Sequence, residues 1–144
     1  MHERLEEHRQ NEVKYDRLHI LILAPSIVVL LFGVLNLMWG LLSIWTGILL
    51  SIIGIVGFFI AGHFVAKAAE CRYSQEDYIM VKIMDVIGEQ VCSDNFQIVA
   101  SADGTQFVTF HNVNVDYETV QAKVDEELRI MNKIAHKDFR VKLL

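Results

Sequence analysis

Charged residues are missing from the middle of this chain. None of the 49 residues from Leu18 to Ala66 is Asp, Glu, Lys or Arg, although 22% of the 144 residues in the whole sequence are charged. A soluble domain of this size does not contain so long an uncharged apolar stretch, because its surface must remain polar. The composition therefore excludes an ordinary soluble globular protein.

The residues that usually carry chemistry are also scarce. The two cysteines, Cys71 and Cys92, do not have the spacing of a zinc or redox motif, and the six histidines are dispersed. Gly88 and Gly104 are the only glycines after position 62, which leaves no glycine-rich loop for a phosphate. We therefore expect no enzymatic activity, no cofactor and no metal site.

The uncharged stretch has the length of two membrane spans. One spanning helix needs about 20 apolar residues, so we predict a helical hairpin with spans from about Leu18 to Leu37 and from about Ser43 to Ala66. Asn36, Trp39 and Gly40 lie near the predicted turn. Asn and Gly favour a turn, and Trp is typical of a membrane interface.

The basic residues predict the orientation of this hairpin. The turn between the spans has none. The basic residues before the first span and after the second are Arg4, Arg9, Lys14, Arg17, Lys67, Arg72 and Lys82. By the positive-inside rule, both termini should face the cytoplasm. The formal net charge of −5 argues against duplex nucleic acid as a partner.

The second span carries small residues at a spacing of seven. They are Gly40, Gly47, Gly54 and Ala61. A stripe of small residues lets helix backbones approach closely in lipid. The partner of this stripe is either the first span of the same chain or another subunit of a homo-oligomer, such as a tetramer, and the two arrangements are compatible.

The chain outside the spans is expected to form a cytoplasmic α+β domain. We predict a polar helical arm at 1–17, the hairpin at 18–66, a coupling linker at 67–74 and the domain at 75–144. Ser74 with Asp77 resembles a capping box at the start of a helix that ends at Gly88 or at Cys92–Asn95. The arm has too little apolar surface for a domain of its own.

The rest of the domain is predicted to form a β-hairpin, a helix and a last strand. Alternating runs at 96–101 and 106–111 flank Asp103-Gly104, which predicts a two-residue turn that pairs Ala100 with Phe107 and Val99 with Val108. A helix should start after Asn114 or Asp116, and its apolar stripe is predicted to be Tyr117, Val120, Val124, Leu128, Met131 and Ala135. Residues 139–143 alternate as a last strand would.

Basic residues gather near the end of the sequence. The cluster consists of Arg129, Lys133, His136, Lys137, Arg140 and Lys142. Basic residues late in a helix complement its dipole, and they could also contact anionic lipid. A third interpretation is a binding site for an anion, for which phosphate is the best candidate.

The layout of the whole chain resembles that of small CRISPR-associated effectors of type III antiviral systems. The resemblance rests on the chain length, the hairpin at 18–66, the orientation and the terminal domain with its basic cluster. It implies a homo-oligomer in the bacterial inner membrane that binds cyclic oligoadenylate in the cytoplasm and then compromises the membrane. The alternative is a structural subunit of a membrane-embedded secretion or envelope assembly that binds protein partners.

Overall fold

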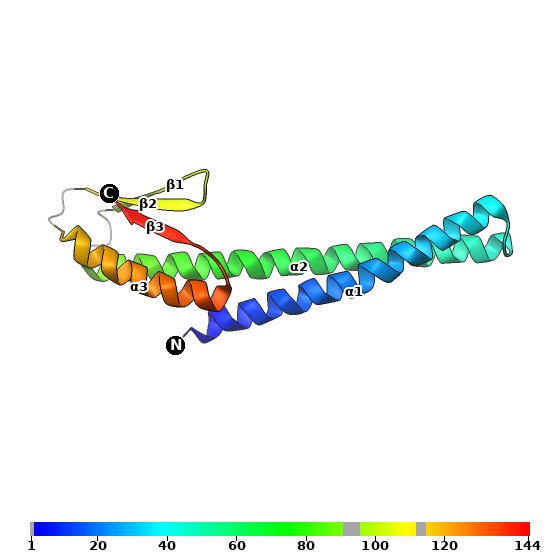
Figure 1. The fold of residues 1–144 in the computed structure, drawn as a ribbon, viewed down its shortest axis with the longest axis horizontal. Coiled ribbons are helices and arrows are strands. Elements are labelled where there is room, and N and C mark those ends of the chain that lie inside the picture. Colours follow the sequence, from blue (N-terminus) through cyan, green and yellow to red (C-terminus); the bar gives the residue numbers. More distant parts are fainter. Residues whose placement is uncertain (1, 91–95, 112–114) are drawn as a thin grey trace. The chain divides into compact units, whose positions relative to one another are not determined.

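The computed structural model describes residues 2–90, 96–111 and 115–144. The order of elements is α1 (Glu3–Trp39), α2 (Ile44–Gln90), β1 (Phe96–Ala100), β2 (Thr105–Phe110), α3 (Tyr117–Ala135) and β3 (Arg140–Leu143) (Figure 1). These elements form two compact units. A helical unit comprises Gln10–Arg72, and an α+β unit comprises the residues up to Arg9 together with Tyr73–Leu144.

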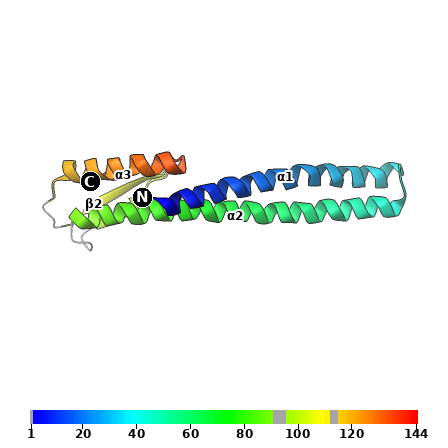
Figure 2. The ribbon, with the colours of Figure 1, turned by 90° about the horizontal axis from the view of Figure 1, so that it is seen from below.

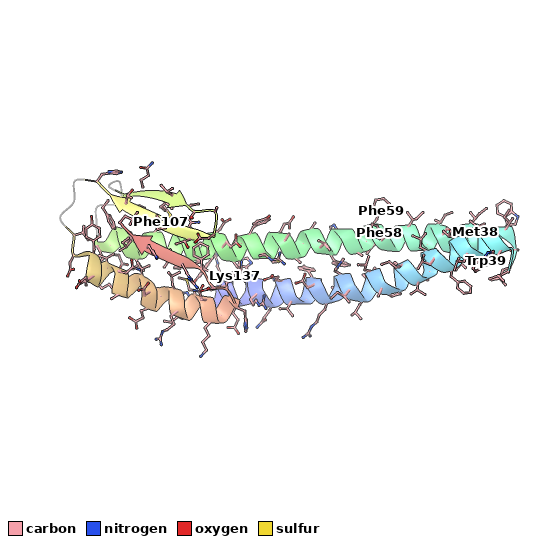
Figure 3. The ribbon with its side chains drawn as sticks, turned by 45° about the horizontal axis from the view of Figure 1, so that its top comes forward. Met38, Trp39, Phe58, Phe59, Phe107 and Lys137 are labelled. Carbon is pink, nitrogen blue, oxygen red and sulfur yellow. The ribbon has the colours of Figure 1, made fainter. Side chains whose placement is uncertain are left out.

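The helical unit contains the apolar parts of α1 and α2. Both helices are long and apolar enough to cross a membrane, and only 11% of the most hydrophobic window of each is buried. Figure 3 shows Phe59 projecting from α2 on the side away from α1, where 73% of its surface is exposed. The predicted pair of apolar helices is confirmed.

The small residues of α2 face α1 of the same chain. A Cβ atom on Gly54 would lie 2.6 Å from the Cβ of Leu30, and one on Gly47 would lie 2.7 Å from the Cδ2 of Leu37. Ala61 is fully buried. Gly40 differs from the other members of the stripe, because a Cβ atom there would meet nothing within 4 Å and its φ is 63°. Glycine adopts this left-handed conformation without strain.

Asn36 closes the turn between the two helices. Its side chain is buried, its amide nitrogen donates to the Ser43 carbonyl at 3.2 Å, and its amide oxygen accepts from the Leu42 N–H at 2.5 Å. These bonds tie the Asn36 side chain to the backbone just before α2.

The prediction of a helix beginning at Ser74 is wrong. α2 is continuous from Ile44 to Gln90, so residues 67–74, predicted as a linker, are helical. This stretch contains no Gly or Pro, and its Ala, Glu, Lys and Arg residues favour a helix. Gly88 lies inside α2, and the other predicted end, Cys92–Asn95, lies outside the described residues.

The strands form one sheet in the order β1-β2-β3, in which β2 is antiparallel to β1 and parallel to β3. The last strand was predicted beside the hairpin, and the structure confirms this. The predicted register of the hairpin is wrong by one residue, since Val99 pairs with Phe107 and Ala100 with Gln106.

The turn explains the difference in register. The Gly104 N–H donates to the Ser101 carbonyl, the Ser101 N–H donates to the Thr105 carbonyl, and Gly104 has a φ of 86°. These features define a three-residue loop with its glycine in the left-handed region, rather than a two-residue turn. In the observed register, one face of the hairpin carries most of the packed apolar side chains: Phe96, Ile98, Val108 and Phe110.

This apolar face packs on the helices of the α+β unit. Figure 2 shows α3 and the last part of α2 in front of the sheet. α3 begins at Tyr117, directly after Asp116, as one of the two predicted starts requires, whereas Asn114, the other, lies outside the described residues. The predicted stripe of α3 is buried except for Tyr117, which is 42% exposed.

The first residues of the chain belong to the core of the same unit. Leu5 is fully buried in the cluster formed by α2, β2, α3 and β3, and His2 is also buried. The polar arm predicted at 1–17 is helical from Glu3, but its first residues pack into this core instead of lying in solvent. One leucine in a polar segment is a weak signal, but this leucine fills a position in the core.

Candidate ligand groove between the third helix and the last strand

Two side-chain amides of α3 clamp the last strand, one by bonding β3 itself and the other by bonding the residue before it. The Gln121 amide donates to the Val141 carbonyl and accepts from the Leu143 N–H, both at 3.0 Å. The Asn132 amide donates to the Phe139 carbonyl at 2.9 Å and accepts from the Phe139 N–H at 3.1 Å. Each amide offers a donor and an acceptor, as a neighbouring strand would.

A groove runs between α3 and β3 beside these clamps. Its main hollow measures about 480 Å³. The lining residues are Gln121, Asp125, Leu128, Arg129, Asn132, Phe139, Arg140, Val141 and Lys142. A hollow of about 440 Å³ adjoins it along α3, shares Gln121 and Asp125, and includes Tyr117 and Leu143. The groove is therefore built on a rigid helix and a clamped strand.

Three basic side chains line the groove, and all three are exposed. Arg129 comes from α3, whereas Arg140 and Lys142 come from β3. Arg140 and Lys142 alternate with buried Val141, so both project from the same face of the strand. Two elements thus supply positive charge to one concave surface.

Acidic groups reduce this charge. Arg140 forms an ion pair with Asp138 at 2.7 Å, and this guanidinium lowers the pKa of the Asp138 carboxyl by hydrogen bonding and by its charge. Asp125 lies in the groove, where its carboxylate accepts from the Gln121 amide at 2.8 Å. A ligand must therefore compete with Asp138 for Arg140, whereas no such competition involves Arg129 or Lys142 among the described contacts.

The other three members of the predicted basic cluster do not line the groove. Lys137, which Figure 3 labels, follows α3. Its Nζ forms an ion pair with Glu76 of α2 at 3.1 Å. His136 is the C-cap of α3, with a φ of 52°, and Lys133 is exposed on the last turn of the helix. The structure thus divides the six residues into a groove set of three and a separate set near the end of α3.

The neutral residues that build the groove were not predicted from the sequence. Gln121 and Asn132 are 11 positions apart, which is three helical turns, so they share a face of α3. Two amides on one helix face, followed by a short terminal strand, are the signal that could have indicated these clamps.

Metal and thiol chemistry find little support in the described part of the chain. No group of three or more His, Cys, Asp or Glu residues there could hold a metal ion. Burial, followed by the charges of Glu12 and Glu70, raises the pKa of the Cys71 thiol. A raised pKa reduces the thiolate fraction and therefore the reactivity of this cysteine.

Comparison with known proteins gives no relative of this chain. No protein-family model matches it, and no curated protein or solved structure shows significant similarity to it.

Proposed function

We propose that this protein is a homo-oligomeric effector of the bacterial inner membrane that senses a small phosphorylated ligand in the cytoplasm. The apolar parts of α1 and α2 insert into the bilayer, and both termini remain cytoplasmic. The α+β unit takes the ligand in the α3–β3 groove. In the layout that the chain resembles, the ligand is cyclic oligoadenylate and the response is loss of membrane integrity in antiviral defence.

The observation that carries this proposal is the convergence of Arg129, Arg140 and Lys142 on one groove. Phosphate oxygens are strong acceptors for guanidinium and ammonium groups, and two elements approach the ligand from different sides. Binding alters the membrane part only if the ligand has different affinities for two conformations of the protein.

Calorimetry on the full-length protein in nanodiscs tests the binding step. At one fixed, modest salt concentration, cyclic oligoadenylates of several ring sizes are titrated into the wild type, Arg129→Gln and Lys142→Gln. A hydrogen bond to a charged group contributes about 1.5–3 kcal/mol, so each variant should weaken binding about 10- to 150-fold. Lys123→Gln is the matched control, because Lys123 is exposed on α3 outside the groove.

Leakage of a dye from vesicles that contain the same proteins tests the response. The ligand should cause leakage with the wild type and with Lys123→Gln, and less with the two groove variants. If none of these ligands binds the full-length protein, the proposal of a nucleotide sensor is wrong.

A structural subunit of a secretion or envelope assembly is the second candidate. The α+β unit exposes apolar side chains that a protein partner could cover, among them Val81 (55%) on α2 and Val99 (51%) on β1. Failure to bind nucleotides, together with stable co-purification of the same partner proteins after mild crosslinking in membranes, would favour this candidate.

A further inference from the structure

His2 occupies a buried position between two helices of the α+β unit. Only 5% of its side chain is exposed. Its Nδ1 lies 2.9 Å from the hydroxyl oxygen of Tyr78 on α2, and the two rings are perpendicular. Its Nε2 lies 3.5 Å from a carboxylate oxygen of Glu127 on α3. One imidazole ring thus links the segment before α1 to both α2 and α3.

We infer that His2 is a protonation-sensitive clamp that holds the first residues of the chain in the α+β unit. In the neutral ring with its proton on Nε2, the Tyr78 hydroxyl donates to Nδ1 and the Nε2–H faces Glu127. In the protonated ring, both nitrogens donate, and a full positive charge faces the Glu127 carboxylate. Protonation therefore converts a neutral contact into an ion pair in a largely buried setting.

The charges around His2 determine the direction of the effect. Glu127 is the facing acid on α3 and is 31% exposed. On α2, Tyr78 faces the ring, and Lys82 lies on the Tyr78 ring with its Nζ 5.7 Å from the centroid. On α1, the exposed Glu3 and Glu6 belong to the first turn, and the Glu6 N–H donates to the His2 carbonyl. Arg4 and Lys82 lie with Glu3 in the hollow beside Tyr78, whereas Glu127 is the acid that faces Nε2 directly, so a charge gained by the ring acts first on Glu127.

His2 lies in one of the two chain segments that connect the α+β unit to the helical unit. Leu5, three residues later, is fully buried in the core of the α+β unit, and the chain leaves that unit after Arg9 to enter the helical unit. It returns at Tyr73. The α+β unit is therefore joined to the helical unit by two chain segments, and His2 fastens the first of them. Lower pH should tighten this attachment, and higher pH should loosen it.

Hydrogen exchange on the full-length protein in nanodiscs tests the inference. The exchange of amides in residues 3–9 is measured at pH 5.5 and at pH 8.0 and corrected for the intrinsic pH dependence of exchange. In the wild type, protection should be about five- to tenfold higher at pH 5.5, since a charged hydrogen bond contributes more than a neutral one. Glu127→Gln keeps the size and a hydrogen-bonding group but removes the charge, so it should abolish this difference.

Two further variants complete the design. His2→Gln should also abolish the difference, and the double variant should behave as either single variant does. Glu126→Gln, an exposed neighbour of Glu127 on α3, is the control and should retain the full difference. Equal protection of the wild type at the two pH values would overturn the inference, and so would a difference that persists in Glu127→Gln. The outcome does not depend on whether a nucleotide binds the α3–β3 groove.

Discussion

The amide oxygen of Gln121 on α3 accepts a hydrogen bond from the backbone N–H of Leu143 on β3, at 3.0 Å. The nitrogen of the same amide donates to Val141, two residues earlier on the strand. β3 is an edge strand, and its outer backbone groups would otherwise be free to pair with another chain. The side chain of Gln121 thus protects this edge and fixes β3 against α3.

Replacing Gln121 by leucine should destabilise the α+β unit by about 2–4 kcal/mol, because two partly buried backbone groups lose their partners. Chemical denaturation of the full-length protein in detergent, followed by circular dichroism, measures the change. Gln97→Leu is the control, because Gln97 lies on an exposed position of β1. An equal effect of the two variants would contradict the role assigned to Gln121.

Truncation of Leu5 should also lower the stability of the α+β unit. Leu5→Ala removes a fully buried side chain from the core and should cost about 2–5 kcal/mol. Leu144→Ala is the matched control, since Leu144 is 62% exposed, and it should cost less than about 0.5 kcal/mol. The measurement is the same denaturation experiment. If Leu5→Ala has no effect, the first residues of the chain do not contribute to this core.

The segments that could be predicted from sequence are those with a long, regular pattern. The uncharged stretch from Leu18 to Ala66 predicted two apolar helices, and the apolar spacing along α3 predicted its buried stripe. Each pattern repeats over many residues, so no single position decides the result. The burial of Leu5 could not be predicted in this way, because one leucine in a polar segment has no periodicity.

The features that the sequence predicted wrongly depend on single residues or on contacts between segments that are distant in the sequence. Asp103-Gly104 is compatible with a two-residue or a three-residue loop, and the choice shifts the whole register of the hairpin by one. In the basic cluster, Lys137 pairs with Glu76, which is 61 positions away in the sequence. Charge patterns along a sequence do not show such partners, so the groove set of three could not be separated from the other members.

The hairpin turn predicts a dependence of stability on pH. The Asp103 carboxylate accepts from the Thr105 N–H at 3.0 Å, and this bond, with further hydrogen bonds from Ser101 and Thr105, lowers its pKa. A carboxyl whose pKa is lower in the folded state stabilises the fold above its unfolded pKa of about 3.9, and this contribution is lost as the pH falls through the folded value.

Asp103→Asn keeps an acceptor oxygen but cannot titrate. The thermal midpoint of the wild type should exceed that of Asp103→Asn at pH 6, and the difference should shrink as the pH falls below about 4. Thermal unfolding measured by circular dichroism between pH 2 and pH 6 gives this comparison. A difference in midpoint that stays constant over this range would show that the charge of Asp103 does not stabilise the turn.

Substitutions at two glycines of α2 distinguish packing within a chain from packing between chains. Gly54 faces Leu30 of α1, so Gly54→Leu should force the two helices apart and lower the stability of the hairpin. A Cβ atom on Gly62 would meet no other segment within 4 Å, so Gly62→Leu should be neutral or stabilising within one chain, because leucine favours a helix by about 0.8 kcal/mol over glycine. Unfolding in a titration of denaturing detergent measures the stability, and light scattering after size-exclusion chromatography measures the oligomeric state.

The two readouts together locate the interface of the proposed homo-oligomer. If subunits meet on the side of α2 that carries Gly62, Gly62→Leu should reduce the oligomer and leave the hairpin of each chain intact. If both variants leave the oligomer unchanged while Gly54→Leu weakens the hairpin, then the predicted small-residue stripe packs within the chain, and subunits associate through other surfaces. If Gly54→Leu leaves the hairpin as stable as the wild type, the close approach of α1 and α2 at Leu30 is not required for their packing.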